Sequence, residues 1–269
     1  MEFRTIVDIN APGFRIEPCE EMLFVGSCFA DNIGARFKEE KFRATVNPFG
    51  VMYNPASILH TVERLSLAEP SILGSLRTAF FTLGTNHIYR LKETGEIVDN
   101  CQKRPQSLFT EEELTVDECA NYLQKAIDIL RAANPDIHVV LTVSPIRYRK
   151  YGYHGSQLSK ATLLLATRQV AGASYFPAYE IINDELRDYR FYAEDMLHPS
   201  SQAVEYIWQR LSEVYLSDGA KQFIKEWQPL KAALNHKPFN PESQEYRIFM
   251  DKTMLKIAEL QKKYPNFAV

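Results

Sequence analysis

The sequence has little of several features that mark particular protein classes. Its four cysteines, Cys19, Cys28, Cys101 and Cys119, show no paired C-x-x-C spacing, which argues against a zinc site and against a disulfide framework. No apolar run approaches the length of a membrane span, and the first residues lack the pattern of a signal peptide. No long basic block is present, so nucleic acid is not an expected partner. We therefore expect a cytoplasmic protein with free thiols and no membrane or nucleic-acid partner.

The composition is that of an ordinary globular protein. The chain has 269 residues, of which 45% are hydrophobic and 24% charged, and its formal net charge is −3. This length allows one large α/β domain with an appendage. We expect that domain over residues 1–217 and a charged, all-helical extension over 218–269, which is either a packing appendage or the arm of a homodimer. No two histidines have the i, i+4 spacing of a helical metal site, and we expect no metal and no cofactor.

Short apolar runs alternate with helical patterns along the main domain. Strands are expected at 22–25, 43–46, 79–83 and 138–143, and a last short strand with a turn at 173–180. Helices are expected at 31–40, from residue 55, at 159–171 and at 201–215, and over 110–133, where the helix is either continuous or broken near 115–117. A small hairpin is expected over 88–98, a flap over 148–157 and a last helix over 243–263. This alternation predicts a doubly wound α/β fold with a mainly parallel sheet.

Two adjacent side chains that can act as nucleophiles follow the first of these strands. Ser27 and Cys28 come directly after Gly26, between the strand and the first helix. At a helix start, the free N–H groups and the dipole lower the pKa of a thiol and stabilise an oxyanion. The structural alternative is that Cys28 is a buried small hydrophobic residue and that Ser27 caps the helix.

Polar residues also follow the strands expected at 79–83 and 138–143, and an Asp-x-x-His pattern occurs later. The carboxyl ends of parallel strands meet at one edge of a sheet, where sites form in open α/β folds. Together these segments could supply a nucleophile, a base, a group that orients the base, and donors for an oxyanion. The pattern therefore indicates acyl-transfer chemistry.

The motifs resemble those of a known family. Gly26-Ser27-Cys28-Phe29-Ala30 is the naming motif of the GSCFA-domain proteins, which are placed in the SGNH/GDSL hydrolase superfamily. Further blocks resemble that family at 47–50, 82–85, 100–101, 144–145 and 176–199. The resemblance covers residues 1–215. It implies a flavodoxin-like three-layer α/β/α sandwich with a hydrolase site at the carboxyl edge of the sheet.

The resemblance also implies roles for particular residues. The first superfamily block reads Gly-Asp-Ser, and an overlay without gaps places Ser27 on its aspartate and Cys28 on its serine nucleophile. Cys28 is therefore the favoured nucleophile and Ser27 the alternative. The last block implies that His198 takes the proton of the nucleophile and that Asp195 orients the imidazole.

Other positions match the blocks that bind the oxyanion and the substrate. Gly50 corresponds to the glycine of the second block, and Gly84 and Asn86 to the Gly-x-Asn of the third. His87, beside Asn86, and Arg147, at the end of the strand at 138–143, are further candidates for substrate contacts.

The expected function is hydrolysis of an acyl or acetyl ester through a covalent acyl-enzyme. Related families suggest a carbohydrate-like or other small polar substrate. An acyltransferase that uses the same groups is one alternative, and it would show turnover that depends on an added alcohol. A non-catalytic ligand-binding module is the other, and it would show an inert Cys28 thiol.

Overall fold

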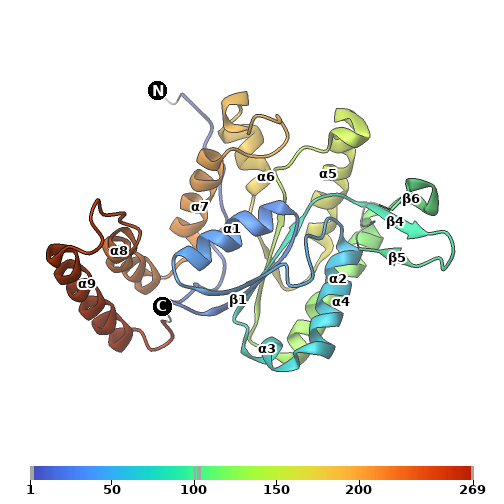
Figure 1. Cartoon of the computed structure of the whole chain (residues 1–269). Coiled ribbons are helices and arrows are strands. Elements are labelled where there is room, and N and C mark those ends of the chain that lie inside the picture. The colour runs from blue at the N-terminus through green and yellow to red at the C-terminus, as the bar shows by residue number, and fades with distance from the viewer. Residues whose placement is uncertain (1–2, 100, 102–103, 268–269) are drawn as a thin grey trace.

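The computed structural model describes residues 3–99, 101 and 104–267. In this part of the chain a five-stranded parallel sheet has the strand order β2-β1-β3-β7-β8, and helices cover both of its faces (Figure 1). The prediction of a three-layer α/β/α fold with a mainly parallel sheet is therefore confirmed. Because the strands run in the same direction, their carboxyl ends share one edge.

The elements of the main sheet and its helices follow one another along the chain. The parallel strands are β1 (Glu21–Gly26), β2 (Arg43–Val46), β3 (Thr78–Leu83), β7 (His138–Val143) and β8 (Ala173–Tyr175). The helices are α1 (Cys28–Glu39), α2 (Pro55–Ala68), α3 (Pro70–Ser75), α4 (Val116–Ala133), α5 (Gly152–Gln169), α6 (Ala178–Glu180), α7 (Ser201–Tyr215), α8 (Asp218–Leu234) and α9 (Gln244–Lys263). A second, antiparallel sheet has the order β5-β4-β6 and consists of β4 (His87–Leu91), β5 (Ile97–Val98) and β6 (Phe109–Glu113).

Alternate residues of the buried strands supply two separate cores. In β1, Leu23 and Val25 pack with helices α2, α4 and α5, whereas Met22 and Phe24 pack with α1 and α7. Successive side chains of a strand point to opposite faces, so a strand covered on both sides must be apolar throughout. This explains why the strands read as continuous apolar runs.

Helices α8 and α9 form a small lobe with its own core, beside the end of α1 (Figure 1). Trp227 fills that core, and its indole N–H donates a 2.9 Å hydrogen bond to the carbonyl of Glu39. Lys231 forms a 3.0 Å ion pair with the buried carboxylate of Glu40. The domain boundary at 217/218 and the homodimer arm remain predictions.

Three local predictions were wrong. Residues 110–113 form strand β6 rather than the first turn of a helix, and α4 begins only at Val116, after a capping box between Thr115 and Glu118. The expected flap at 148–157 is a short 3₁₀ turn, Arg149–Tyr151, followed directly by α5. Helix α1 begins at Cys28, three residues before the predicted start, because the Ser27 side chain caps it there. Of the motif at 100–101, residue 100 lies outside the described residues.

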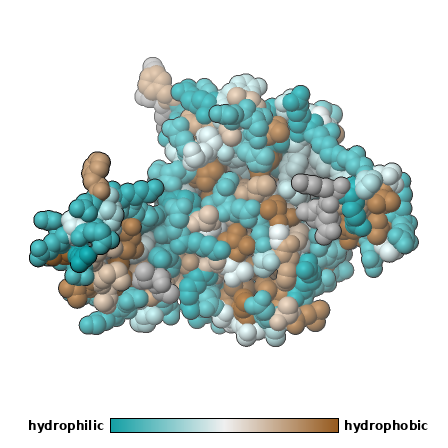
Figure 2. Space-filling view, in the orientation of Figure 1, coloured by the Kyte–Doolittle hydropathy of each residue, from teal (hydrophilic) through white to brown (hydrophobic). Residues whose placement is uncertain are grey.

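In the described part of the chain, no helix is both long and apolar enough to cross a bilayer. The face in Figure 2 is mostly hydrophilic, with hydrophobic residues in small separate patches. Within the same residues, no three His, Cys, Asp or Glu side chains come together to hold a metal ion.

Candidate functional site

The β1–α1 corner is fixed by hydrogen bonds and by the lack of a side chain at Gly26. Gly26 has a φ of +146°, and a Cβ there would lie 2.1 Å from the carbonyl oxygen of Thr82. Its N–H donates a 2.9 Å hydrogen bond to Asn47 Oδ1, and its carbonyl accepts one of 2.9 Å from the N–H of Met52. Only glycine allows this close approach of strands β1 and β3. The corner therefore holds the residues that follow in one position.

Ser27 serves as the N-cap of α1. Its Oγ accepts a 3.3 Å hydrogen bond from the N–H of Phe29 and lies 3.3 Å from Thr82 Oγ1. The residue is 0% exposed. Such a cap satisfies one of the free N–H groups of the first helical turn. The Ser27 hydroxyl is thus buried and has partners within the fold.

Cys28 is the first residue of α1 and is half-buried. Burial raises the pKa of its thiol, whereas a hydrogen bond with the Tyr53 hydroxyl and one from its own backbone N–H act to lower that pKa. The net effect is upward, so the thiol is protonated at neutral pH. Cys28 therefore needs a base before it can attack as a thiolate.

Asp195 and His198 form the pair that the sequence predicts. His198 Nδ1 lies 2.6 Å from Asp195 Oδ2, and Asp195 Oδ1 accepts the backbone N–H groups of Leu197 and His198 at 2.8 and 3.0 Å. These hydrogen bonds lower the pKa of Asp195 to about 2. The carboxylate thus stays ionised and fixes the tautomer that leaves Nε2 as the basic nitrogen.

The loop that carries His198 is tied to the end of β7 and reaches α1. The N–H of Arg147 donates a 3.0 Å hydrogen bond to the carbonyl of Leu197. Pro199, next to His198, lines a hollow of about 530 Å³ together with Asn32 of α1. Among the described residues, no hydrogen bond joins His198 to Cys28 or Ser27. The predicted base is therefore not in hydrogen-bond contact with either predicted nucleophile in the described part of the chain.

The three residues expected to bind an oxyanion donate hydrogen bonds within the fold. The N–H of Gly50 bonds to the carbonyl of Asn47 at 2.9 Å, and the N–H of Gly84 bonds to that of Tyr53 at 2.9 Å. The Asn86 side-chain amide donates to the carbonyl of Leu114 at 2.8 Å. Asn86 is 2% exposed. These donors stabilise the turns around the corner.

Comparison with family models identifies the chain. The model of the GSCFA family matches residues 21–72 and 68–211. The chain belongs to the GSCFA family. A second model, described as the C-terminal domain of GSCFA domain proteins, matches residues 227–269. The described residues of that range include the last part of α8 and all of α9. No curated protein sequence matches the chain.

Solved structures similar to this GSCFA family member share little sequence with it. A GDSL-like lipase from Bacteroides thetaiotaomicron is 14% identical, with 77% of this chain and 88% of that chain covered and a TM-score of 0.44. An acetylxylan esterase mutant from Geobacillus stearothermophilus is 11% identical, with 76% and 98% covered and a TM-score of 0.44. A family 3 carbohydrate esterase from Clostridium thermocellum is 11% identical, with 81% and 99% covered and a TM-score of 0.42.

The two candidate substrate contacts of this GSCFA protein lie in different surroundings. His87 belongs to the small sheet, where its Nδ1 lies 3.1 Å from Glu111 Oε1 and its ring stacks on Tyr151 at 3.6 Å. Arg147 instead donates a 3.0 Å hydrogen bond to the carbonyl of Met196, in the loop that carries His198. Its guanidinium also lies over the rings of Tyr153, Tyr189 and Tyr192. Arg147 is therefore the candidate that lies next to the loop with Asp195 and His198.

Arg147 and two of these tyrosines line a hollow of about 270 Å³. The lining is a mixture of aromatic, amide and charged side chains: Arg147, Gln157, Asn183, Arg187, Asp188, Tyr189 and Tyr192, with Ile182. Such a combination of aromatic faces and hydrogen-bonding groups suits a small polar ligand.

Sequence reasoning missed Lys160 altogether. This α5 lysine is 1% exposed, and its Nζ donates hydrogen bonds of 2.6 and 2.8 Å to the carbonyls of Gly84 and Ser144. Burial lowers its pKa to about 7. A signal was present, because Ser156, Ser159 and Lys160 extend the buried face of α5 beyond Leu163 with polar residues. An inward face that becomes polar next to strand ends indicates a site.

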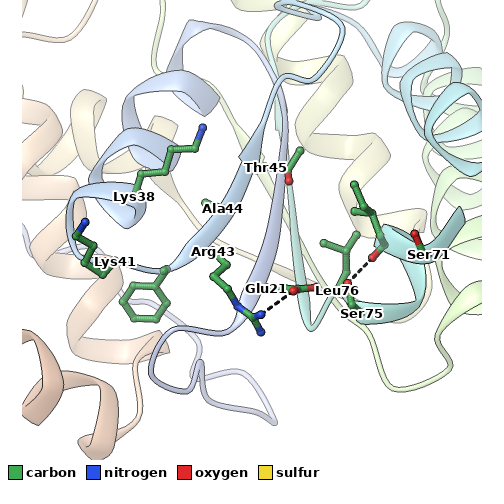
Figure 3. A pocket seen from close by; sticks show the side chains of 11 residues that line it. Glu21, Lys38, Lys41, Arg43, Ala44, Thr45, Ser71, Ser75 and Leu76 are labelled. Carbon is green, nitrogen blue, oxygen red and sulfur yellow. Dashed lines mark hydrogen bonds and ion pairs between the residues drawn. The ribbon is translucent and has the colours of Figure 1, made fainter. Parts of the chain in front are cut away.

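A further hollow, of about 650 Å³, lies at the opposite end of the sheet (Figure 3). Its walls include Glu21, the first residue of β1, and Arg43, which forms a 2.9 Å ion pair with Glu21. Lys38 and Lys41 also line it (Figure 3). The corner at Cys28 follows the other end of β1, so this hollow is separate from the candidate active site.

Proposed function

We propose that this protein is an ester hydrolase that uses Cys28 as its nucleophile. The observation that carries the proposal is the contrast between the two neighbouring residues at the β1–α1 corner. The Ser27 hydroxyl is fully buried and caps α1, whereas the Cys28 thiol is half-buried at the helix start and contacts Tyr53. A nucleophile must reach an incoming carbonyl carbon, and of these two residues Cys28 is the one that is partly exposed, which supports the proposal.

The reaction begins when His198 takes the thiol proton and the sulfur of Cys28 attacks the ester carbonyl carbon. The carbonyl π electrons move to oxygen and form a tetrahedral oxyanion. When it collapses, the alcohol leaves with the proton from His198, and a thioester remains on Cys28. Water, deprotonated by His198, then hydrolyses the thioester and restores the thiol. Asp195 stabilises the imidazolium at both stages.

This mechanism requires the loop at 193–200 to approach Cys28 when substrate binds. Catalytic hydrogen bonds are often long or absent in unliganded enzymes and form in the complex with substrate. The hydrogen bonds between Arg147 and the loop couple it to the hollow that Tyr189 and Tyr192 line. A ligand in that hollow would contact the same arginine and order the loop.

The composition of the hollow supports a polar acyl or acetyl ester, such as one on a sugar. Tyrosine faces pack against the carbon skeleton of a sugar ring, and amide and guanidinium groups bond to its hydroxyls. The same site could pass the acyl group to an alcohol instead of water, and turnover that rises with added alcohol would indicate acyl transfer.

The test is hydrolysis of p-nitrophenyl acetate, with intact-mass analysis of the enzyme after a brief reaction. We expect an acetyl adduct on Cys28, a loss of about 10³-fold or more in kcat/KM for Cys28→Ala, and about 10²-fold or more for His198→Ala. Cys101→Ala is the matched control, since it removes another partly accessible thiol outside the corner, and it should retain activity. Equal activity of Cys28→Ala and wild type would reject the proposal. If the wild type neither turns over nor forms an adduct, the ligand-binding alternative is favoured.

A further inference from the structure

Tyr148 carries a buried polar group that the fold does not use. Among the described residues, its hydroxyl is buried and has no hydrogen-bond partner. Buried polar groups nearly always have partners, so a free one in a native fold needs an explanation. The backbone of Tyr148 is anchored, because its N–H donates a 3.2 Å hydrogen bond to Ser156 Oγ. The free hydroxyl is therefore held in place on a fixed part of the chain.

The Tyr148 hydroxyl lies among the residues of the candidate active site. It packs against Gly84, where a Cβ would lie 2.3 Å from it. Its ring meets that of Tyr53 edge-on at 6.3 Å. Tyr53 connects this ring to the corner that carries Cys28, because the Tyr53 carbonyl accepts the N–H of Gly84 at 2.9 Å and the preceding residue, Met52, donates to the carbonyl of Gly26 at 2.9 Å. Burial is the main cause of a rise in the pKa of Tyr148. The Tyr148 hydroxyl is therefore a neutral phenol that is able to donate a hydrogen bond at this corner.

An oxyanion that forms at Cys28 needs donors that are free to bind it. The N–H groups of Gly50 and Gly84 and the side-chain amide of Asn86 already donate to carbonyls of the fold. The backbone N–H of Cys28 lies at the helix start, where the first N–H groups have no partner within the helix. A second donor is needed, because oxyanions are commonly bound by at least two preorganised N–H or O–H groups.

We propose that the Tyr148 hydroxyl is that second donor and is a catalytic residue of this site. This inference rests on the proposed function. When the Cys28 sulfur bonds to the ester carbonyl carbon, the carbonyl π pair becomes a lone pair on oxygen, and that oxygen accepts a hydrogen bond from Tyr148. No proton is transferred, and the bond is released when the tetrahedral intermediate collapses. The phenol acts in the same way during hydrolysis of the thioester.

Lys160 is the positioning residue for this donor. Its Nζ lies 5.1 Å from the centre of the Tyr148 ring, and it donates to the carbonyls that follow β3 and β7. Those contacts hold Gly84 and Ser144 in fixed positions relative to each other. The Tyr148 hydroxyl packs against Gly84, and the chain runs from Ser144 to Tyr148. In its protonated form Lys160 also places a positive charge near the ring, which makes the phenol a stronger donor.

The experiment compares two reactions of the same thiol in Tyr148→Phe and wild type. Acetylation of Cys28 by p-nitrophenyl acetate forms an oxyanion, whereas alkylation of Cys28 by iodoacetamide displaces iodide and needs no oxyanion donor. We expect Tyr148→Phe to slow acetylation by about 10²- to 10³-fold and to leave alkylation within about threefold of wild type. Tyr122→Phe, on α4, is the matched control and should leave both rates unchanged.

Each outcome decides the role of Tyr148. If acetylation in Tyr148→Phe stays within about threefold of wild type, the assignment is overturned. If both reactions slow equally, Tyr148 acts on the thiol rather than on the oxyanion, and the assignment is again overturned. Folding is checked by thermal unfolding, because loss of an unpartnered buried hydroxyl should not lower the midpoint. A wild type that acquires no acetyl group on Cys28 rejects the proposed function itself, and this assignment with it.

Discussion

The β1–α1 corner and the region after β7 differ in one buried polar side chain, because that region contains a buried hydroxyl that has no partner within the described fold. Gly26 and Ser27 donate or accept hydrogen bonds with Asn47, Thr82 and Phe29. Across the same sheet edge, the Tyr148 hydroxyl has no partner among the described residues, and Lys160 is held there by carbonyls and by no carboxylate.

This difference indicates that the groups that position the Cys28 nucleophile are not the groups that would bind a developing negative charge. A corner with satisfied hydrogen bonds stabilises the fold and keeps Cys28 at one place. A buried donor without a partner costs folding free energy and gains a partner only when a ligand or an intermediate provides one. Substitutions in the corner should therefore mainly change stability, and substitutions in the second region should mainly change chemistry or its dependence on pH.

The largest loss of stability is expected for Gly26→Ala. The added methyl group would lie 2.1 Å from the Thr82 carbonyl oxygen, at a φ of +146° that other residues rarely adopt. We expect the free energy of unfolding to fall by about 3 kcal/mol, as measured by urea denaturation. Gly74→Ala is the control, because nothing lies within 4 Å of its Cβ position. A loss below about 1 kcal/mol in Gly26→Ala would mean that the corner adjusts and does not fix Cys28.

The next effect concerns the dependence of stability on pH. Burial lowers the pKa of Lys160 from 10.5 to about 7, so the unfolded chain binds more protons than the folded chain between these values. The contribution of Lys160 to the free energy of unfolding therefore rises as the pH increases above about 7, by up to about 1.4 kcal/mol per pH unit. Below about pH 7 this contribution does not change with pH. Lys160→Met lacks this contribution.

Urea denaturation at several pH values between 6 and 9 measures this pH-dependent contribution of Lys160 to the free energy of unfolding. The difference in unfolding free energy between wild type and Lys160→Met should be constant below pH 7 and should shift in favour of wild type above it. Lys125→Met, an exposed lysine of α4, is the control and should follow the wild type throughout. Parallel curves for wild type and Lys160→Met would show that Lys160 keeps its ordinary pKa in the folded protein.

The sequence predicted the features that depend on local patterns. The strands at 138–143 and 43–46 and the helix at 201–215 have the predicted bounds, because apolar periodicity and capping residues determine them. The Asp195–His198 contact also follows from local spacing, since an aspartate three residues before a histidine can accept its backbone N–H and hold its ring.

Features that depend on distant parts of the chain could not be predicted. Residues 110–113, with three glutamates, have low strand propensity, and they are a strand because they pair with β4 on an exposed sheet. The burial of Lys160 depends on two carbonyls, Gly84 and Ser144, that lie 76 and 16 residues away in sequence. The free hydroxyl of Tyr148 is visible only when its surroundings are known. Of these features, only the polar continuation of the buried face of α5 is a local sequence pattern, and it does not show which groups Lys160 contacts.

The smallest of these effects is expected for Ser27→Ala. This substitution tests most directly whether Ser27 is a helix cap and Cys28 the nucleophile. Loss of the cap should lower the free energy of unfolding by about 1 kcal/mol, and hydrolysis of p-nitrophenyl acetate should stay within a few-fold of wild type. Ser243→Ala removes an equivalent cap from α9, where Ser243 Oγ accepts the N–H of Tyr246 at 3.2 Å, and should have a similar effect on stability. If Ser27→Ala abolished hydrolysis while its stability matched that of Ser243→Ala, the loss could not be explained by the cap. The nucleophile would then be Ser27, and the buried hydroxyl would have to become exposed before each reaction.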